Sequence, residues 1–367
     1  MSDALIRLRE LELDHGDFSL RIPRLDVHRH ETLTLIGHNG SGKSSLLRVL
    51  SLLAPPTSGT LEFDNEPLAS SSRRQLALRR RMASVLQQPL LCRASVFHNV
   101  ALGLRFRKVA KSEVEQRVMS WLRRLRIDHL RERDARGLSG GEAQRASIAR
   151  AMVLDPDVLF LDEPFSALDP PTRHELIDEF QQILAETRTT TVFATHDRGE
   201  ALALSDRIAV VQRGQIAQWG SAEEVFTQPT SEDVARFVGA ATLIPGAVRQ
   251  VEDGLLHIDA DGVMLTVLGE AQVGERVTIC VRPEHVILSA SPERTTSARN
   301  VLHGTVERIT RSDTGFRIVV DCGSPVVATV TESALRELEI EVGRRVAASF
   351  KATAAHTIRR SSGDVAQ

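Results

Sequence analysis

Two kinds of hydrophobic pattern alternate along the first part of the chain. Short continuous apolar runs, at residues 33–36 and 158–161, are typical of buried strands. Longer segments, at residues 45–50, 146–154 and 173–186, have the apolar pattern of helices. Strands that alternate with helices predict an α/β fold for this part of the chain.

The segment between residues 95 and 136 is predicted to be helical. Its apolar residues recur at helix spacing and form one stripe, which we expect to pack in a core. The members of this stripe are Val114, Val118, Trp121, Leu122 and Leu125.

The pattern changes at about residue 240, where short alternating runs separated by glycine replace the helical periodicity. Such runs are typical of strands. Residues 244–248 resemble residues 302–306, and residues 273–277 resemble residues 342–346, so this part of the chain contains a repeat. We therefore predict two related β modules that form small barrels.

Composition and length narrow the class of protein. A chain of 367 residues with 42% hydrophobic residues can form two domains with full cores. It has no apolar run of roughly 18 residues and no signal peptide at its start, so we expect a cytoplasmic protein that does not cross a membrane. Its three cysteines lie far apart, which suits a reducing compartment, and its net charge of -2 gives no global attraction to nucleic acid. The basic runs 79–81 and 105–108 are predicted to be solvated helix faces or, alternatively, contacts with a partner subunit.

A glycine-rich segment follows the first predicted strand and leads into a predicted helix. Its sequence matches the pattern that binds the phosphates of a nucleotide, because glycines let backbone N–H groups point inward in front of a helix N-terminus. Lys43 would reach the β- and γ-phosphates, and the Ser44 hydroxyl would ligate Mg²⁺. The predicted nucleotide-binding residues here are Gly37, His38, Asn39, Gly40, Ser41, Gly42, Lys43, Ser44 and Ser45.

Two adjacent carboxylates end the second predicted strand. Asp162 is placed to hold the Mg²⁺ shell. Glu163 is predicted to face the opposite side, since successive strand residues alternate, and to act as the base that orients a water on the γ-phosphate. Paired carboxylates after a strand can also be a helix N-cap or part of a solvated loop, but the phosphate loop upstream favours the catalytic interpretation.

A second glycine-bearing loop, with Ser139, Gly140 and Gly141, enters the predicted helix at residues 146–154. A helix N-terminus with small residues is a second anion site. One nucleotide needs only one such cradle, so we predict that this loop serves the nucleotide of another subunit.

Three of these segments together resemble the nucleotide-binding subunit of an ATP-binding cassette (ABC) transporter: GHNGSGKS at 37–44, LSGGEAQR at 138–145 and VLFLDEP at 158–164. The resemblance extends over residues 1–238 and rests on five motifs in order. It implies a P-loop NTPase domain with a helical subdomain, using ATP and Mg²⁺. It also makes residues 166–169 the loop that crosses the dimer interface.

The resemblance assigns roles to single residues. Gln87 takes the place of the glutamine that contacts Mg²⁺ and water, and His196 that of the switch histidine at the γ-phosphate. The implied catalytic residues are Glu163, His196, Lys43 and Gln87, and the implied metal ligands are Ser44, Gln87 and Asp162.

One position departs from the family. ABC subunits usually stack an aromatic residue, often tyrosine, on adenine, but this chain has no tyrosine. By its spacing from Gly16, His15 occupies that position and can still stack. Phe18 is the alternative, unless it packs in the core.

The tail resembles the β-barrel regulatory (TOBE) domain of many importers, and its second half resembles the molybdate-binding module at residues 297–304 and 348–353. Its side chains suit an oxyanion, since they provide hydroxyl, guanidinium, amide and ammonium donors. These donors are Ser297, Arg299, Asn300 and Lys351. Alternatively, Arg299 and Asn300 only begin a strand while Lys351 is solvated. The resemblance implies that pockets in this module form between subunits.

The resemblance as a whole implies the ATP-hydrolysing subunit of an ABC importer, peripheral on the cytoplasmic face of the membrane. It implies a homodimer with two transmembrane permease subunits and an extracytoplasmic solute-binding protein, and no nucleic acid. Molybdate or tungstate is the expected cargo, and sulfate, ferric iron or a polyamine are alternatives. An ABC ATPase of DNA repair or translation and an oxyanion storage protein are the other classes considered.

We expect three domains or modules separated by short connections. Residues 1–238 form the ATP-binding domain, residues 240–290 the first β module and residues 296–360 the molybdate-binding-like module. Residues 291–297, rich in Ser, Thr and Pro, are the predicted linker.

Overall fold

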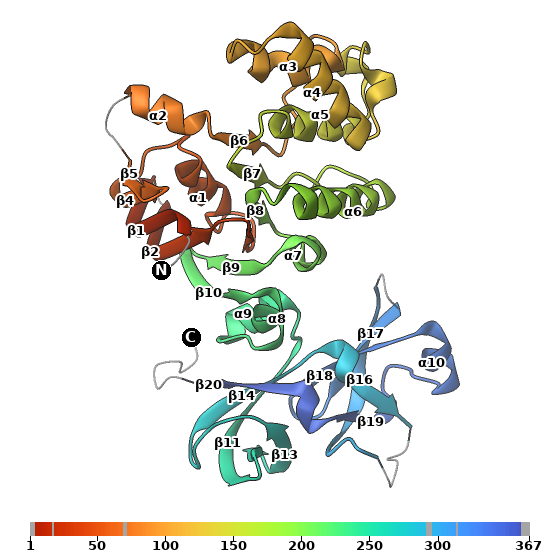
Figure 1. Ribbon diagram of the computed structural model, residues 1–367. Helices are drawn as coiled ribbons and strands as arrows, with labels where there is room; N and C mark the ends of the chain where they lie inside the picture. Colours follow the sequence, from red (N-terminus) through yellow and green to blue (C-terminus); the bar gives the residue numbers. More distant parts are fainter. Residues whose placement is uncertain (1–3, 17, 69–71, 291–295, 313–314, 361–367) are drawn as a thin grey trace. The chain divides into compact units, whose positions relative to one another are not determined.

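The computed structural model describes residues 4–16, 18–68, 72–290, 296–312 and 315–360 (Figure 1). The chain divides into two compact units, Met1–Ala222 and Glu223–Gln367.

This division precedes the predicted boundary at residue 238 because two short helices pack with the second unit. They are α8 (Ala222–Thr227) and α9 (Glu232–Val238). Ala235 of α9 lies in one apolar cluster with Cys280 and Ile358, and Glu232 accepts a hydrogen bond of 2.7 Å from the Thr278 hydroxyl. We therefore propose that the domain boundary lies near residue 222.

The first unit is built on a six-stranded sheet with the order β10-β9-β3-β8-β7-β6. Five of its strands run parallel, and β10 pairs antiparallel with β9. Every residue of β3 and β8 is buried, as expected for parallel strands covered on both faces. The strands are β3 (Thr32–Ile36), β6 (Met82–Val85), β7 (Val158–Asp162), β8 (Thr190–Thr195), β9 (Arg207–Gln212) and β10 (Gln215–Ser221).

The carboxyl ends of these parallel strands meet at one edge of the sheet. Ile36 is paired with Thr195, and Asp162 with Ala194. The loops that follow β3, β7 and β8 therefore start side by side, which is where open α/β sheets bind ligands. The α/β fold is thus confirmed, with the predicted motifs on neighbouring strands.

A four-stranded antiparallel sheet, ordered β2-β1-β4-β5, forms the second layer of this unit. Helix α1 (Lys43–Leu50) lies in the core between the layers, since Leu46 and Leu47 share one apolar cluster with Leu8, Leu20 and Leu35. The strands are β1 (Ala4–His15), β2 (Phe18–His28), β4 (Ser58–Phe63) and β5 (Glu66–Pro67), and helix α2 (Ser72–Arg79) follows.

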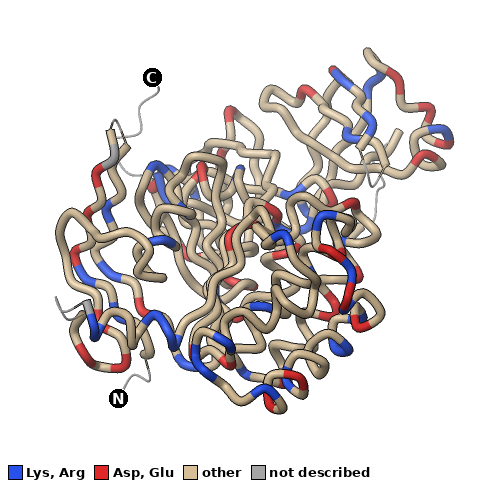
Figure 2. The backbone as a smooth tube through the Cα atoms, turned by 90° about the horizontal axis from the view of Figure 1, so that it is seen from above, with Lys and Arg blue, Asp and Glu red and all other residues tan. Residues whose placement is uncertain are grey.

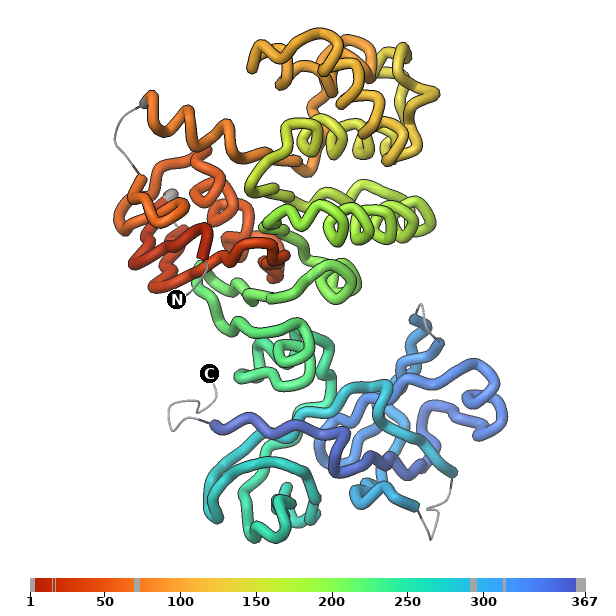
Figure 3. Tube along the Cα trace, viewed as in Figure 1, coloured from red at the N-terminus to blue at the C-terminus, as the bar shows by residue number. Residues whose placement is uncertain are grey.

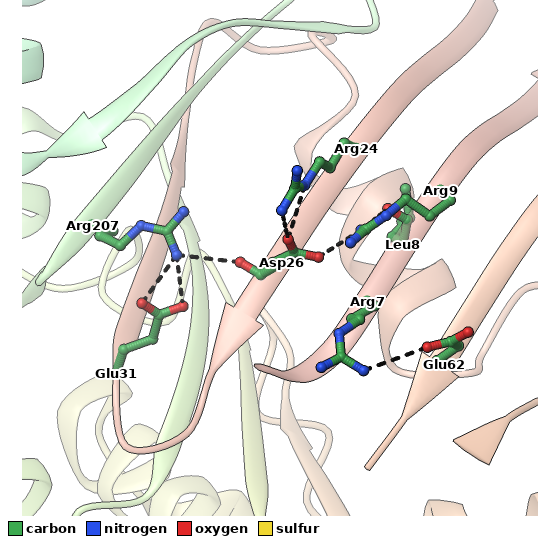
Figure 4. A network of polar contacts seen from close by, with 8 residues as sticks. All are labelled: Arg7, Leu8, Arg9, Arg24, Asp26, Glu31, Glu62 and Arg207. Carbon is green, nitrogen blue, oxygen red and sulfur yellow. Dashed lines mark hydrogen bonds and ion pairs between the residues drawn. The ribbon is translucent and has the colours of Figure 1, made fainter. Parts of the chain in front are cut away.

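A polar network holds the antiparallel sheet beside β9 (Figure 4). Asp26 on β2 accepts hydrogen bonds from Arg24 at 3.0 and 2.7 Å and from Arg9 at 2.5 Å. Arg207 at the start of β9 bonds both carboxylate oxygens of Glu31 at 3.1 Å and the carbonyl oxygen of Asp26 at 3.3 Å. Burial acts to raise the pKa of Asp26, but Arg9 and Arg24 hold it below its usual value. The network links the antiparallel sheet to the strand next to β3.

Helices gather at the other end of the first unit, away from β1 and β2 (Figure 3). The predicted stripe is confirmed: Val114, Val118, Leu122 and Leu125 are buried, and Trp121 packs against the same cluster. The elements here are α3 (Val96–Phe106), α4 (Lys111–Arg124) and α5 (Gly140–Met152), with 3₁₀ turns at Asp128–Leu130 and Ala135–Gly137. Two further helices flank the sheet, α6 (Pro170–Thr187) and α7 (Arg198–Leu204).

The second unit contains two five-stranded antiparallel sheets, ordered β13-β12-β11-β14-β20 and β15-β19-β16-β17-β18. The sequence repeat is visible in their pairing, because Gly246 faces Val277 in the first sheet as Gly304 faces Val346 in the second. The strands are β11 (Thr242–Glu252), β12 (Leu255–Ala260), β13 (Val263–Leu268), β14 (Arg276–Val281), β15 (Ile287–Ser289), β16 (Asn300–Ser312), β17 (Gly315–Asp321), β18 (Pro325–Val330), β19 (Arg345–Phe350) and β20 (Ala355–Arg359). Helix α10 (Glu332–Glu337) and 3₁₀ turns at Pro283–His285 and Ala352–Ala354 complete the unit.

The two sheets exchange strands across the module boundaries expected from the sequence. Strand β15 pairs with β19 of the second sheet, and β20 pairs with β14 of the first. The two modules are therefore intertwined rather than consecutive. Residues 291–295 of the predicted linker lie outside the described residues.

Charged residues of both signs are interspersed along the described backbone (Figure 2). Among the described residues, no helix is both long and apolar enough to span a bilayer.

Candidate functional site

The glycine-rich loop joins β3 to α1, and two of its glycines are required by geometry. A Cβ on Gly37 would lie 2.1 Å from the carbonyl oxygen of Val211. Gly42 has a φ of 110°, in the left-handed region, and forms the N-cap of α1. The loop therefore holds its backbone against β9 and directs a helix N-terminus at the sheet edge.

Lys43 lies at the centre of the candidate site. Its side chain is 4% exposed, and its Nζ donates to the carbonyl oxygens of Gly37 at 2.8 Å and His38 at 3.1 Å. Its Nζ also lies 4.0 Å from Oε1 of Glu163. Burial lowers the pKa of Lys43, while the charges of Glu163 and Asp162 act to raise it. The loop thus buries a cation that it could offer to phosphate oxygens.

Ser44 and Asp162 form an oxygen pair beside this lysine. The Ser44 hydroxyl donates to Oδ1 of Asp162 at 2.8 Å. Burial raises the pKa of Asp162, and the neighbouring charge of Glu163 raises it further. The hydrogen bond from Ser44 acts in the opposite direction. A bound cation would favour the ionised form of Asp162 instead.

The chemistry of these donors fits Mg²⁺. A hydroxyl and a carboxylate are hard oxygen ligands, and Mg²⁺ is usually held by one or two such groups together with phosphate and water oxygens. Consistent with this sparse set, the described residues contain no group of three or more His, Cys, Asp and Glu that could hold a metal ion.

Glu163 corrects one prediction. Strand β7 ends at Asp162, and Glu163 has a left-handed φ of 45°, with its N–H donating to the carbonyl oxygen of Ala194 at 2.9 Å. Strand alternation therefore stops before Glu163, and the expectation that the two carboxylates face opposite sides is wrong. Both lie near Lys43.

His196 faces the same carboxylate from the next strand. Its Nδ1 lies 3.2 Å from Oε2 of Glu163, and its side chain is half exposed while that of Glu163 is 14% exposed. The two side chains follow β7 and β8, which pair in the sheet. The structure thus brings together Lys43, Ser44, Asp162, Glu163 and His196.

Sequence reasoning missed the group that shapes the His196 loop. Thr195 donates to Oε2 of Glu200 at 2.5 Å, and Asp197 caps α7 by accepting from the Glu200 N–H at 3.0 Å. Burial raises the pKa of Glu200 to about 7. The available signal was the spacing of Asp197 and Glu200, which suits a helix N-terminus.

Gln87 lies at the margin of this cluster rather than within it. Its side chain is exposed, and its Nε2 lies 3.4 Å from the hydroxyl of Ser166. That hydroxyl donates to the carbonyl oxygen of Glu163 at 2.9 Å. Gln87 is therefore connected to Glu163 through Ser166, and within the described part of the chain its side chain forms no hydrogen bond with Asp162 or Ser44.

The second glycine loop lies at the start of α5. Ser139 and Glu142 form a capping box, in which Ser139 accepts from the Glu142 N–H at 3.3 Å and donates its own N–H to Glu142 at 2.7 Å. A Cβ on Gly141 would lie 2.7 Å from Thr172 in α6, and one on Gly140 would lie 3.9 Å from Ala167. The neighbours of the two glycines thus belong to the start of α6 and the loop before it.

The remaining phosphate-loop residues support its fold. The Ser41 N–H donates to the His38 carbonyl oxygen at 3.1 Å, and the Ser41 hydroxyl is buried without a hydrogen-bond partner among the described residues. Asn39 is exposed, and Gly40 has a φ of 78°. Ser45 lies half-buried in the first turn of α1.

The two adenine candidates differ in what the structure describes. His15 ends β1 opposite Phe18, and its side chain lies outside the described part of the chain. The ring of Phe18 packs against the phosphate loop, since a Cβ on Gly42 would lie 2.7 Å from its Cζ. This contact favours the packing interpretation for Phe18.

The candidate oxyanion donors of the second unit divide into two kinds. Ser297, Arg299 and Lys351 are exposed. The β16–β19 ladder ends at the pair Asn300 and Phe350, so Arg299 and Lys351 lie at the same end of two paired strands.

Asn300 is different, because it is 1% exposed and its amide is already bonded. Its Oδ1 accepts from the Thr266 N–H at 2.7 Å, and its Nδ2 donates to the Thr266 carbonyl oxygen at 2.8 Å. It thereby ties β13 of one sheet to β16 of the other. Because both amide atoms are occupied, we propose that Asn300 does not bind an oxyanion directly and instead positions its neighbour Arg299.

Comparisons with known proteins agree with this geometry. The ABC transporter family model matches residues 20–166, and the TOBE domain model matches residues 296–357. The chain is 36% identical over 357 residues to the molybdate/tungstate import ATP-binding protein WtpC of Pyrococcus horikoshii, which covers 96% of this chain and 99% of that protein.

Two further similarities cover less of the chain. The sulfate/thiosulfate import ATP-binding protein CysA of Xylella fastidiosa is 38% identical over 291 residues, 78% of this chain and 81% of that protein. The dimeric structure of a bacterial ABC transporter cassette is 26% identical, with a TM-score of 0.54, and covers 59% of this chain and 98% of that one.

Proposed function

The chain belongs to the ATP-binding subunits of ABC transporters, which are ATPases, and from this premise we propose that it energises the import of molybdate or tungstate. The observation that supports this cargo is the nearly full-length similarity to a molybdate/tungstate import protein, which includes the second unit. Arg299 and Lys351, two exposed cations at one end of the β16–β19 ladder, suit a dianion. Sulfate is the alternative cargo, supported by the shorter similarity to CysA.

ATP hydrolysis is proposed to take place at the shared edge of β3, β7 and β8. Lys43 would bind the β- and γ-phosphates, Ser44 and Asp162 would hold Mg²⁺, and Gln87 would contact the cation and water. When bound, Mg²⁺ neutralises charge on the phosphates. The convergence of these side chains on Lys43 is the observation that carries the assignment.

Glu163 is the proposed base for the attacking water. Its Oε2 lies 3.2 Å from His196, so a water held by Glu163 would be close to a second polar group that can contact the γ-phosphate. Positioning and electrostatic stabilisation supply most of the catalysis in phosphoryl transfer. The left-handed backbone at Glu163 ends the strand alternation, and its carboxylate oxygens lie 4.0 Å from Lys43 and 3.2 Å from His196.

A second copy of the chain is proposed to complete each site. Ser139, Gly140 and Gly141 form the N-terminus of α5, a ready anion site, yet the two glycines lie near the start of α6 and the loop before it. A related cassette has been solved as a dimer. In a homodimer, this loop of one chain would cover the nucleotide on the phosphate loop of the other.

Transport requires partners that this chain does not contain. We propose two permease subunits in the membrane and an extracytoplasmic solute-binding protein, with this homodimer peripheral on the cytoplasmic face. A permease that co-purifies with the chain and stimulates its ATPase would support this arrangement.

The cargo is tested by calorimetry of the full chain with molybdate, tungstate and sulfate. We expect binding of molybdate and tungstate, weakened about tenfold or more by Lys351→Ala or Arg299→Ala, because each removes one charge-assisted bond worth roughly 1.5–3 kcal/mol. The matched control is Arg317→Ala, in the same sheet but on β17. Tighter binding of sulfate would favour the alternative cargo, and no binding of any anion would leave the second unit without this role.

A further inference from the structure

Arg173, in the first turn of α6, joins two loops of the catalytic edge. Its Nη2 donates to the carbonyl oxygen of Leu168 at 3.2 Å, and its Nη1 lies 3.4 Å from Oδ2 of Asp197. The side chain is 27% exposed, and its Nε is buried without a hydrogen-bond partner among the described residues.

Each of these loops carries one member of the Glu163–His196 pair. The loop that ends at Leu168 begins at Glu163, whose carbonyl oxygen is bonded by Ser166. Asp197 directly follows His196 and caps α7. The guanidinium of Arg173 therefore joins the loop after β7 to the loop after β8. The 3.2 Å contact between His196 and Glu163 joins the same two loops a second time, so the contacts form a closed ring.

The location of Arg173 argues against a role in stabilising its own helix. Helix α6 begins at Pro170, with Asp169 as its N-cap, so Arg173 lies at the positive end of the helix dipole. A cation is disfavoured there unless other contacts compensate. The bonds to Leu168 and Asp197 are such contacts, and the flat guanidinium can hold two acceptors at a fixed geometry as lysine cannot.

We propose that Arg173 is a positioning residue for ATP hydrolysis, which fixes Glu163 and His196 relative to each other by bridging the loops that carry them. The inference rests on the proposed role of Glu163. A displacement of about 1 Å at a catalytic group can cost 10²-fold in rate, so a partial loosening of this ring should lower turnover. Nucleotide binding through Lys43 lies outside the ring and should be preserved.

The test compares Arg173→Gln, Arg173→Lys and Asp197→Asn in the full-length protein. Asparagine is as good an N-cap as aspartate, so Asp197→Asn keeps the cap of α7 and removes only the charge that faces Arg173. We expect Arg173→Gln and Asp197→Asn each to lower kcat by about tenfold, with the KM for ATP changed less than about twofold. Arg173→Lys should recover part of the rate, since an ammonium can still bond one of the two acceptors.

The double variant Arg173→Gln/Asp197→Asn distinguishes a shared bridge from two separate structural effects. If the two groups act through one bridge, the kcat of the double variant should fall no further than that of the more impaired single variant. Independent effects would instead multiply to a loss of about a hundredfold in kcat. Arg81→Gln is the control, because Arg81 also bridges two carboxylates in this unit, Asp64 and Asp157, away from the catalytic edge. It should leave kcat unchanged.

Three results would overturn the inference: an unchanged kcat in Arg173→Gln, a rise in KM in place of the fall in kcat, or multiplicative losses in the double variant. Its failure is separable from that of the proposed function. If the Arg173 variants kept a normal kcat while Glu163→Gln was inactive, only the bridge would be rejected. If Glu163→Gln was active, the assigned base would be rejected.

Discussion

The catalytic edge of the first unit and the candidate oxyanion site of the second differ in how much one chain completes. At the catalytic edge, Glu163 lies 4.0 Å from Lys43 and 3.2 Å from His196, and the Ser44–Asp162 pair is already bonded. In the second unit, the side chains of Arg299 and Lys351 are exposed and make no hydrogen bond or ion pair with the described residues.

This difference follows from how each region is built. Parallel strands end together, so residues after β3, β7 and β8 converge within one chain. The donors of the second unit lie at the open end of a two-strand ladder, which brings two cations together but encloses nothing. The proposed hydrolytic groups are therefore brought together by the fold of one chain, while the proposed anion donors need a further surface to form a pocket.

The largest effect is expected when the catalytic edge loses its proposed base. Glu163→Gln keeps the volume of the side chain and removes the charge that orients the water. We expect hydrolysis to fall by about a hundredfold or more, the scale of a general base, with ATP binding near normal. Phosphate release and nucleotide affinity, measured on the same preparation, check this prediction. Continued turnover in the variant would place the base elsewhere.

A change in pH dependence should follow from Glu200, which lies under the His196 loop. Its pKa rises from 4.5 to about 7 on folding, so the folded state binds the extra proton. The stability that protonated Glu200 contributes to the folded state is present at low pH and is lost as the pH rises from 4.5 to about 7.

Glu200→Gln should remove that loss, because glutamine stays neutral. As the pH rises across these limits, we expect the variant to gain about 3 kcal/mol in unfolding free energy relative to the natural chain. Urea unfolding at several pH values measures the difference. Parallel curves for the two proteins would contradict the assignment.

A smaller effect is expected from the bridge between the two sheets of the second unit. Asn300→Leu removes both hydrogen bonds to the backbone of half-buried Thr266. The N–H and the carbonyl oxygen of Thr266 then lose these partners. We expect this to lower the unfolding free energy by about 1–2 kcal/mol. It should also weaken oxyanion binding by displacing Arg299, without changing hydrolysis in the first unit.

Chemical denaturation and calorimetry of the variant separate these effects. Arg317→Ala is again the control for the second unit, since its exposed side chain on β17 makes no bond to Thr266. Unaltered stability in Asn300→Leu would mean that the two sheets are held together by their apolar core alone.

Much of the catalytic edge could be predicted from the sequence because its signals are local. The strands, the glycine loop and the carboxylates at the strand end occur in immediate succession, and the parallel fold then brings them together. The direction of Glu163 could not be predicted, because a glutamate in the left-handed region breaks the alternation on which the prediction rested.

Contacts between distant segments account for the other differences. Arg173 and Asp197 meet only because α6 and α7 pack near the same sheet edge. Likewise, Asn300 bonds to Thr266, and β15 and β20 change sheets, through pairings between segments far apart in the chain. Composition and periodicity describe each segment but not its partner.

The claim that two chains complete each ATP site is tested most directly by mixing two inactive variants. Ser139→Arg blocks the second glycine loop, and Lys43→Ala disables the phosphate loop, so neither homodimer should hydrolyse ATP. A mixture should regain activity, because a heterodimer has one site with both loops intact, and Ser139→Arg should still bind nucleotide through its own Lys43. No recovery on mixing, together with loss of nucleotide binding in Ser139→Arg, would mean that both loops serve one nucleotide within a single chain.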